Sequence, residues 1–221
     1  SLVGSEMCIR DSSKQPNSRW YSGSGIYRDV NLWTGKGVYI SHDKLRITTL
    51  SVNDDMAVLE VCAQLKNIIG HGLEAECLIE IKKDGQKAAS NTQRVVFRSE
   101  QMQTVRVQIP IEHPKKWSPK QPALYECHIT TKFDDKICDE AVSNFGIRVL
   151  ALDPVHGLQI NGETVKLRGT CIHHDNGVIG AETFKEAEWY RCKRLKEAGF
   201  NAIRSAHHPM SRAMLDACDH L

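Results

Sequence analysis

The 221-residue chain has little net charge, few aromatic residues and no long apolar run. Its 29 Lys and Arg residues nearly balance 27 Asp and Glu residues, so the formal net charge is only +2. A field this weak excludes partners bound by bulk charge alone, such as nucleic acid or an anionic membrane. No apolar run approaches the roughly 20 residues that a membrane-spanning helix needs. An apolar fraction of 41% still supports a packed core and argues against wholesale disorder.

Several motifs of well-known binding and catalytic sites are also absent. The sequence has no Walker loop and no Rossmann glycine pattern, so nucleotide binding of those two kinds is not expected. Ser205 lies outside any Gly-x-Ser-x-Gly turn, which argues against a serine hydrolase of that type. Eight cysteines are present, but they are widely spaced and form no CxxC pair. We therefore expect mainly free, buried thiols, with structural disulfides as the alternative.

The two ends of the chain differ from what lies between them. Ser1–Ser12 (SLVGSEMCIRDS) resembles a translated sequencing-adaptor peptide, and we predict that residues 1–12 are not native. A natural, disordered N-terminal segment is the alternative. The helix expected from Ser211 reaches Leu221 without a cap or a glycine. We therefore expect the chain to be a piece of a longer protein.

The remaining sequence begins with two zones of predicted strands. Residues 13–38 hold turn glycines and a predicted strand at Ile26–Trp33, a piece too short to form a core alone. Residues 39–148 carry short strand-like runs separated by turn signals, which is typical of an immunoglobulin-like β-sandwich. The strands predicted in this second zone are Leu45–Val52, Met56–Leu65, Leu73–Lys82, Arg94–Phe97, Gln103–Ile109, Leu124–Lys132 and Ala141–Gly146.

The hydrophobic period changes in residues 149–221, where a β-α-β-α order predicts the start of a parallel α/β unit. Thr183 and Glu186 are predicted to cap the first helix as a capping box, and Arg191 interrupts its apolar face. The predicted elements are a hairpin with an Asn161–Gly162 turn, a strand Lys166–Ile172, a helix Ala181–Phe200, a strand Asn201–Ala206 and a helix from Ser211. The residues expected on the apolar face of the first helix are Phe184, Ala187, Cys192, Leu195 and Ala198.

Polar side chains follow both predicted strands of this third zone. His173 and Asp175 come after the first strand, and Arg204 and His207 close the second. Because carboxyl ends of parallel strands meet at one edge, we expect these side chains to converge on a pocket. Hydrogen-bonding groups of mixed charge suit a polyhydroxylated ligand, and an arginine can hold a catalytic carboxylate ionised. Ordinary polar turn residues and a metal site are the alternatives; adjacent side chains in His173-His174-Asp175 diverge, which disfavours a metal.

Three groups of motifs together resemble glycoside hydrolase family 2, the group of β-galactosidases, β-glucuronidases and β-mannosidases. The first is Ser18–Val30. The second comprises Trp117-Ser118-Pro119, Leu124-Tyr125 and Phe145–Arg148. The third comprises Leu167–Gly169, His173–Asp175, Gly199–Arg204 and His207–Pro209. The resemblance implies that residues 13–38 are the tail of a jelly-roll sugar-binding domain and 39–148 an immunoglobulin-like sandwich. It also implies that residues 149–221 are the first two β/α units of a truncated (β/α)8 barrel.

The resemblance also implies roles for individual residues. Arg204 matches the family arginine that hydrogen-bonds the nucleophilic glutamate, while His173 and His207 match histidines that contact the bound sugar. Asp175 matches an acidic position near that site. By the same resemblance, Arg19 and Trp20 lie on the jelly-roll loop that approaches the active site and are further candidates for sugar contact. The alternative is that these two side chains only pack the loop.

Both catalytic glutamates of the family are expected to lie outside this chain. Retaining glycosidases use two carboxyl groups about 5–5.5 Å apart, and no Asn-Glu pair occurs in the sequence. The resemblance implies an inactive piece of a retaining exo-β-glycosidase, most similar to β-galactosidases, with β-glucuronidase as the alternative. A non-catalytic carbohydrate-binding module is a second alternative, which an aromatic content of 6% disfavours. No cofactor or metal ligand set is visible, and the longer protein would be bacterial, cytoplasmic or periplasmic, and able to form oligomers.

Overall fold

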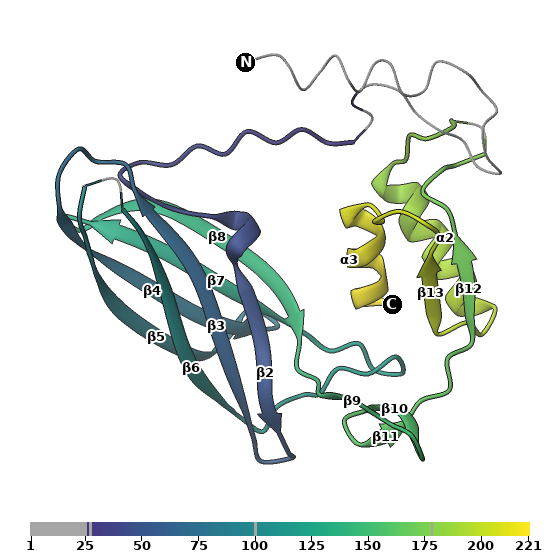
Figure 1. Ribbon diagram of the computed structural model, residues 1–221. Coiled ribbons are helices and arrows are strands. Elements are labelled where there is room, and N and C mark those ends of the chain that lie inside the picture. The colour runs from purple at the N-terminus through teal and green to yellow at the C-terminus, as the bar shows by residue number, and fades with distance from the viewer. Residues whose placement is uncertain (1–25, 27, 100, 178) are drawn as a thin grey trace. The chain divides into compact units, whose positions relative to one another are not determined.

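The computed structural model describes residues 26, 28–99, 101–177 and 179–221. The chain divides into two compact units (Figure 1). One unit is Trp33–Val165, and the other combines the described residues before Trp33 with Lys166–Leu221. Within the described ranges, no helix is both long and apolar enough to cross a membrane.

Two four-stranded sheets make up most of the unit Trp33–Val165 (Figure 1). In the first sheet β3 pairs with β1 and β2 along one edge and with β6 along the other, all antiparallel. The second sheet is antiparallel in the order β5-β4-β7-β8. The strands of the first sheet are β1 (Val38–Ile40), β2 (Arg46–Val52), β3 (Met56–Asn67) and β6 (Met102–Glu112). Those of the second are β4 (Leu73–Lys83), β5 (Gln86–Phe97), β7 (Leu124–Phe133) and β8 (Lys136–Gly146).

Alternating burial explains why these segments form strands with one covered face. Along β3 every second residue is buried, and β4 and β7 show the same period. The inward side chains of both sheets form one apolar cluster, so the sheets pack as a sandwich, as predicted. The predicted strand Arg94–Phe97 is the end of a longer β5. Its first residues are polar and mostly exposed, which hid them from an apolar pattern.

The short strand β1 is held by hydrogen bonds from the second sheet as well as from β3. The Thr131 hydroxyl donates to the Val38 carbonyl at 2.7 Å, and the Ile40 amide donates to Asp139 Oδ2 at 2.8 Å. Both bonds connect residues of the first sheet with β7 or β8 of the second. A three-residue strand therefore helps to fix the two layers to each other.

The motif residues around Trp117 form one packed junction at the end of β8. The Trp117 amide donates to the Ile147 carbonyl at 2.8 Å, and the Arg148 guanidinium lies 4.2 Å from the Trp117 ring centroid. A Cβ at Gly146 would lie 2.7 Å from Trp117 Cβ and Cγ, so only glycine fits there without a shift. The indole is buried, and the motif residues therefore serve packing in this unit.

A small antiparallel sheet follows the junction, in the order β11-β10-β9. Asn161 and Gly162 both have positive φ in the turn between β10 and β11, which confirms the predicted hairpin. The Asn161 side-chain amide donates to the Trp117 carbonyl at 2.9 Å and so ties the hairpin to the sandwich. The strands are β9 (Leu150–Asp153), β10 (Gly157–Ile160) and β11 (Glu163–Thr164).

The second unit has the predicted β-α-β-α order. Its strands β12 (Gly169–Ile172) and β13 (Ala202–Ser205) pair in parallel, and the helices are α2 (Lys185–Glu197) and α3 (Arg212–His220). Ser211 caps α3, since its hydroxyl accepts the Met214 amide hydrogen at 3.1 Å. The buried residues of this unit's apolar cluster are Ile172, Cys192, Met210, Met214 and Ala217.

Three further predictions about the presence, bounds or caps of elements differ from the structure. No strand occurs in the described part of Ile26–Trp33, whose apolar side chains are exposed and where no described strand offers backbone partners. The strand expected from Lys166 begins only at Gly169. The first helix spans Lys185–Glu197 without a capping box, because Phe184 is its N-cap residue and the Thr183 hydroxyl bonds to Glu188 instead.

Candidate functional site

Hydrogen bonds join the segment that leads into β12, around Leu167–Gly169, to the segment that leads into β13, around Gly199–Asn201. The Asn201 side chain accepts the Arg168 amide hydrogen at 2.7 Å and donates to the Lys166 carbonyl at 3.0 Å. The Arg168 guanidinium in turn donates to the Gly199 carbonyl at 3.1 Å. These bonds set the register in which Gly169 faces Ala202 and Cys171 faces Arg204.

The parallel pair β12–β13 has one face toward the helices and one face away from them. Ile172 and Ile203 belong to the cluster under α2 and α3. Because side chains alternate along a strand, Cys171 and Arg204 lie on the opposite face. There Arg204 Nη1 lies 3.5 Å from Cys171 Sγ, and both side chains are exposed. The helix-free face therefore carries the predicted arginine.

His173 connects the two strand ends. Its Nδ1 lies 2.5 Å from the Ala206 carbonyl oxygen, and because a carbonyl can only accept, Nδ1 carries a proton. The rings of His173 and His207 have centroids 6.1 Å apart in an edge-on arrangement. The peptide bond between Ala206 and His207 is cis. The predicted pair of histidines is thus brought together, with His173 half-buried and His207 exposed.

A second pair of histidines lies beside the first. The rings of His174 and His208 have centroids 4.7 Å apart. Burial lowers the pKa of His174, and the positive charge of a protonated His208 lowers it further. Arg28 donates from Nη2 to the Pro209 carbonyl at 2.7 Å and also disfavours a charge on His174. The Ser18–Val30 motif therefore contributes a described residue to this site.

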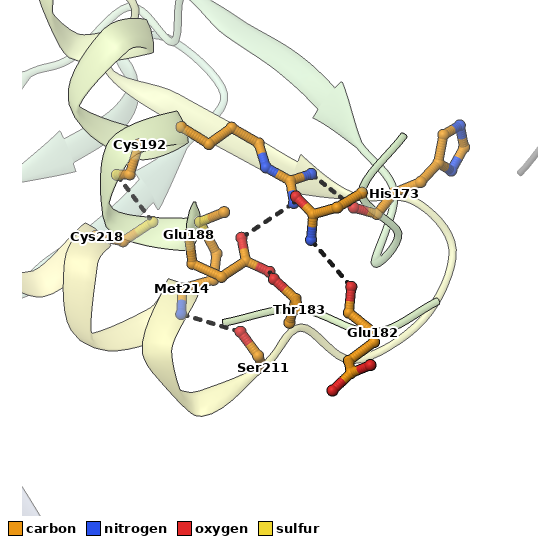
Figure 2. Close-up of polar contacts among 10 residues, drawn as sticks. His173, Glu182, Thr183, Glu188, Cys192, Ser211, Met214 and Cys218 are labelled. Carbon is orange, nitrogen blue, oxygen red and sulfur yellow. Dashed lines mark hydrogen bonds and ion pairs between the residues drawn. The ribbon is translucent and has the colours of Figure 1, made fainter. Parts of the chain in front are cut away.

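Side chains of helix α2 hold the loop after β12 through hydrogen bonds (Figure 2). Arg191 donates from Nη1 to the His173 carbonyl at 3.2 Å and from Nη2 to Asn176 Oδ1 at 2.8 Å. Arg191 Nη2 lies 3.3 Å from Oε2 of Glu188, a carboxylate that is 1% exposed. Thr183 donates to the other carboxylate oxygen of Glu188 at 2.9 Å. The position of His173 thus depends on a buried ion pair in the helix.

Four of the six predicted site residues lie around the two strand ends. His173 and Asp175 are half-buried after β12, whereas Arg204 and His207 are exposed at the end of β13. The other two candidates, Arg19 and Trp20, lie outside the described residues. In the described ranges no group of three or more His, Cys, Asp or Glu side chains is arranged as metal ligands.

Sequence reasoning missed the residues that support the site. The sequence pattern gives no role to Glu188, and in it Arg191 only interrupts an apolar face. The spacing of Glu188 three residues before Arg191 places both on one helix face, which is the signal for an ion pair. The apolar face itself is narrower than predicted, since Phe184 and Ala198 are exposed.

The chain matches known proteins over most of its length. The model of the glycosyl hydrolases family 2 matches residues 38–148. A β-galactosidase of Bacteroides ovatus is 32% identical over 96% of this chain, which spans 25% of that protein. Thus the chain spans about a quarter of the length of this curated relative.

Two solved structures are similar in fold as well as in sequence. A family 2 glycosyl hydrolase of Bacteroides cellulosilyticus superposes with a TM-score of 0.86 at 34% identity, covering 93% of this chain and 28% of that chain. A β-glucuronidase of Bacteroides uniformis superposes with a TM-score of 0.82 at 26% identity, covering 95% of this chain and 26% of that one. Given these likenesses and a family match over half of its residues, the chain belongs to family 2 of the glycosyl hydrolases.

Proposed function

We propose that this chain supplies part of the sugar-binding site of a retaining exo-β-glycosidase. The observation that carries the proposal is the edge where β12 and β13 end, because His173, Arg204 and His207 gather there. In α/β folds ligands bind at the carboxyl ends of parallel strands. Imidazole and guanidinium groups are suited to hydrogen-bond sugar hydroxyls and carboxylates.

In this proposal the parallel pair is the beginning of a (β/α)8 barrel. The helices cover one face of β12 and β13, which would become the outside of the barrel, and Arg204 lies on the face that would line its interior. Residues 13–38 would be the tail of a jelly-roll domain, and residues 39–148 an immunoglobulin-like domain within the sandwich unit. Residues 149–221 would begin the catalytic domain.

The chemistry of retaining hydrolysis needs two carboxyl groups about 5–5.5 Å apart, one as acid and base and one as nucleophile. We place both on glutamates outside these 221 residues. Arg204 would then orient the nucleophile, and His173, Asp175 and His207 would contact the sugar. Arg19 and Trp20 would contribute from the preceding domain.

The proposed substrate of the whole protein is a terminal β-galactoside. The β-galactosidase of Bacteroides ovatus supports this choice by similarity. A β-glucuronide is the second candidate, supported by the likeness to the Bacteroides uniformis β-glucuronidase. A glucuronide differs by a carboxylate, for which Arg28 and Arg204 offer cationic partners at this site.

A turnover assay and a binding assay test the proposal together. The 221-residue chain should release no chromophore from nitrophenyl β-galactoside or β-glucuronide, whereas galactose or glucuronate should show saturation-transfer NMR signals at millimolar concentration. Arg204→Ala should remove these signals, and Arg212→Ala, in an exposed arginine of α3, should keep them. Turnover that disappears in Arg204→Ala would refute the absence of the catalytic carboxylates. Signals unchanged in Arg204→Ala would refute the sugar site.

A further inference from the structure

Two thiols face each other between the helices of the second unit (Figure 2). Cys192 of α2 and Cys218 of α3 have sulfur atoms 3.9 Å apart, although 26 positions separate them in the sequence. Cys192 is 6% exposed, while Cys218 is half-buried, and both lie in the apolar cluster between the helices. A disulfide bond is about 2.05 Å long, so the sulfurs need to approach by about 2 Å.

The two thiols have different chemical character. A hydrogen bond with Cys218 and, more weakly, the positive charge of Lys196 lower the pKa of Cys192 to about 7, against the opposing effect of burial. The same hydrogen bond and burial raise the pKa of Cys218. A thiolate is the nucleophilic form of cysteine, and a second thiol within reach can resolve the product that it forms.

Two other buried cysteines offer an internal contrast. Burial raises the pKa of Cys77 and of Cys127 to about 12, so both stay protonated at neutral pH. Both lie in the core of the sandwich and are fully shielded from solvent. Burial alone therefore leaves these two thiols protonated, and the pair between the helices differs because its sulfurs lie 3.9 Å apart and because Cys218 is only half-buried.

We propose that Cys192 and Cys218 form a redox-active dithiol that closes to a disulfide between α2 and α3 when the protein meets a peroxide. The thiolate of one of the two cysteines attacks hydrogen peroxide, the O–O bond breaks, and a sulfenic acid and hydroxide form. The sulfur of the other cysteine then attacks the sulfenic sulfur, the S–O bond breaks, and water leaves with the proton of this second thiol. Sulfur loses two electrons in total and the peroxide gains them.

The cross-link would restrict the movement of the part of α2 whose side chains hold the loop after β12. Cys192 follows Arg191, whose guanidinium holds the His173 carbonyl and Asn176. A bond from Cys192 to α3 restricts movement of this part of α2 relative to α3. Oxidation would therefore restrain the loop after β12, a consequence that is independent of which sugar the whole protein binds.

The experiment uses the 221-residue chain and a protease that cleaves after glutamate. Cleavage after Glu188 and Glu197 yields residues 189–197 and 198–221, each with one cysteine. After treatment with hydrogen peroxide and blocking of the remaining thiols, mass spectrometry should find the two peptides joined, lighter by two hydrogen atoms than their sum. A reductant added before digestion should separate them.

Variants assign the cross-link to this pair. Cys192→Ser and Cys218→Ser should each abolish the joined peptides, while Cys171→Ser, which removes an exposed thiol, should leave them unchanged. The unsubstituted protein provides a test that needs no variant. Oxidation of the exposed Cys171 shows that the peroxide has reacted with the protein. If peptides 189–197 and 198–221 of the same chain are then not joined, the proposal is wrong. Joined peptides only between two chains would overturn it as well.

Discussion

Replacing Arg191 with methionine tests the ion pair that supports the site. Methionine keeps an aliphatic stem but removes the cationic partner of the Glu188 carboxylate, which is 1% exposed and keeps its hydrogen bond from the Thr183 hydroxyl. Removing one partner of a buried pair costs roughly 3–5 kcal/mol. Because the Arg191 side chain is 24% exposed, water can reach part of the vacated space. We therefore expect the lower end, about 3 kcal/mol.

Hydrogen exchange of the α2 amides in the 221-residue chain measures this loss. About 3 kcal/mol corresponds to roughly a hundredfold faster exchange, since each 1.4 kcal/mol is a factor of ten. Arg194→Met is the matched control on the same helix, because its pair with Glu197 is exposed and should contribute less than about 1 kcal/mol. Adding Glu188→Gln to Arg191→Met should recover part of the loss, since glutamine carries no buried charge. Equal exchange in Arg191→Met and Arg194→Met would refute the reasoning.

Two further predictions concern a histidine and a glycine. The depressed pKa of His174 means that the unfolded chain binds more protons, so the stability of the second unit should hold above about pH 6.5 and fall below it. Calorimetry of the wild type against His174→Asn at pH 7.5 and 5.5 measures this, and an unchanged difference between the two pH values would contradict it. Gly146→Ala should destabilise the sandwich by about 1–3 kcal/mol, because its Cβ would meet Trp117 at 2.7 Å. A urea midpoint equal to that of the wild type would disprove the clash.

The sandwich could be predicted because apolar and polar residues alternate along its strands. Alternating apolar residues in β3 and β6 are dictated by a sheet with one buried face. The same alternation wrongly predicted a strand at Ile26–Trp33. No described strand lies beside this segment to pair with its backbone. The beginning of β5 was missed because its polar side chains carry no such period.

The candidate site could be predicted only in outline. Parallel pairing of β12 and β13 follows from the β-α-β order, so the gathering of His173 and His207 was foreseeable. The contact of Arg28 with Pro209 bridges 181 positions, and no local pattern encodes it. The pairing of Thr183 with Glu188 replaced a capping box that the sequence spacing favoured, because the carboxylate is buried beside Arg191.

The bond from His173 to the Ala206 carbonyl couples the energies of the two strand ends. Substituting His173 removes its own ring and also a bond to the residue immediately before His207. Energies of residues that share such partners are not additive. In a double-mutant cycle, changes at positions 173 and 207 should therefore interact, and neither single substitution would report the share of one histidine in ligand binding. The pair is the smallest meaningful unit for mutational analysis of this edge.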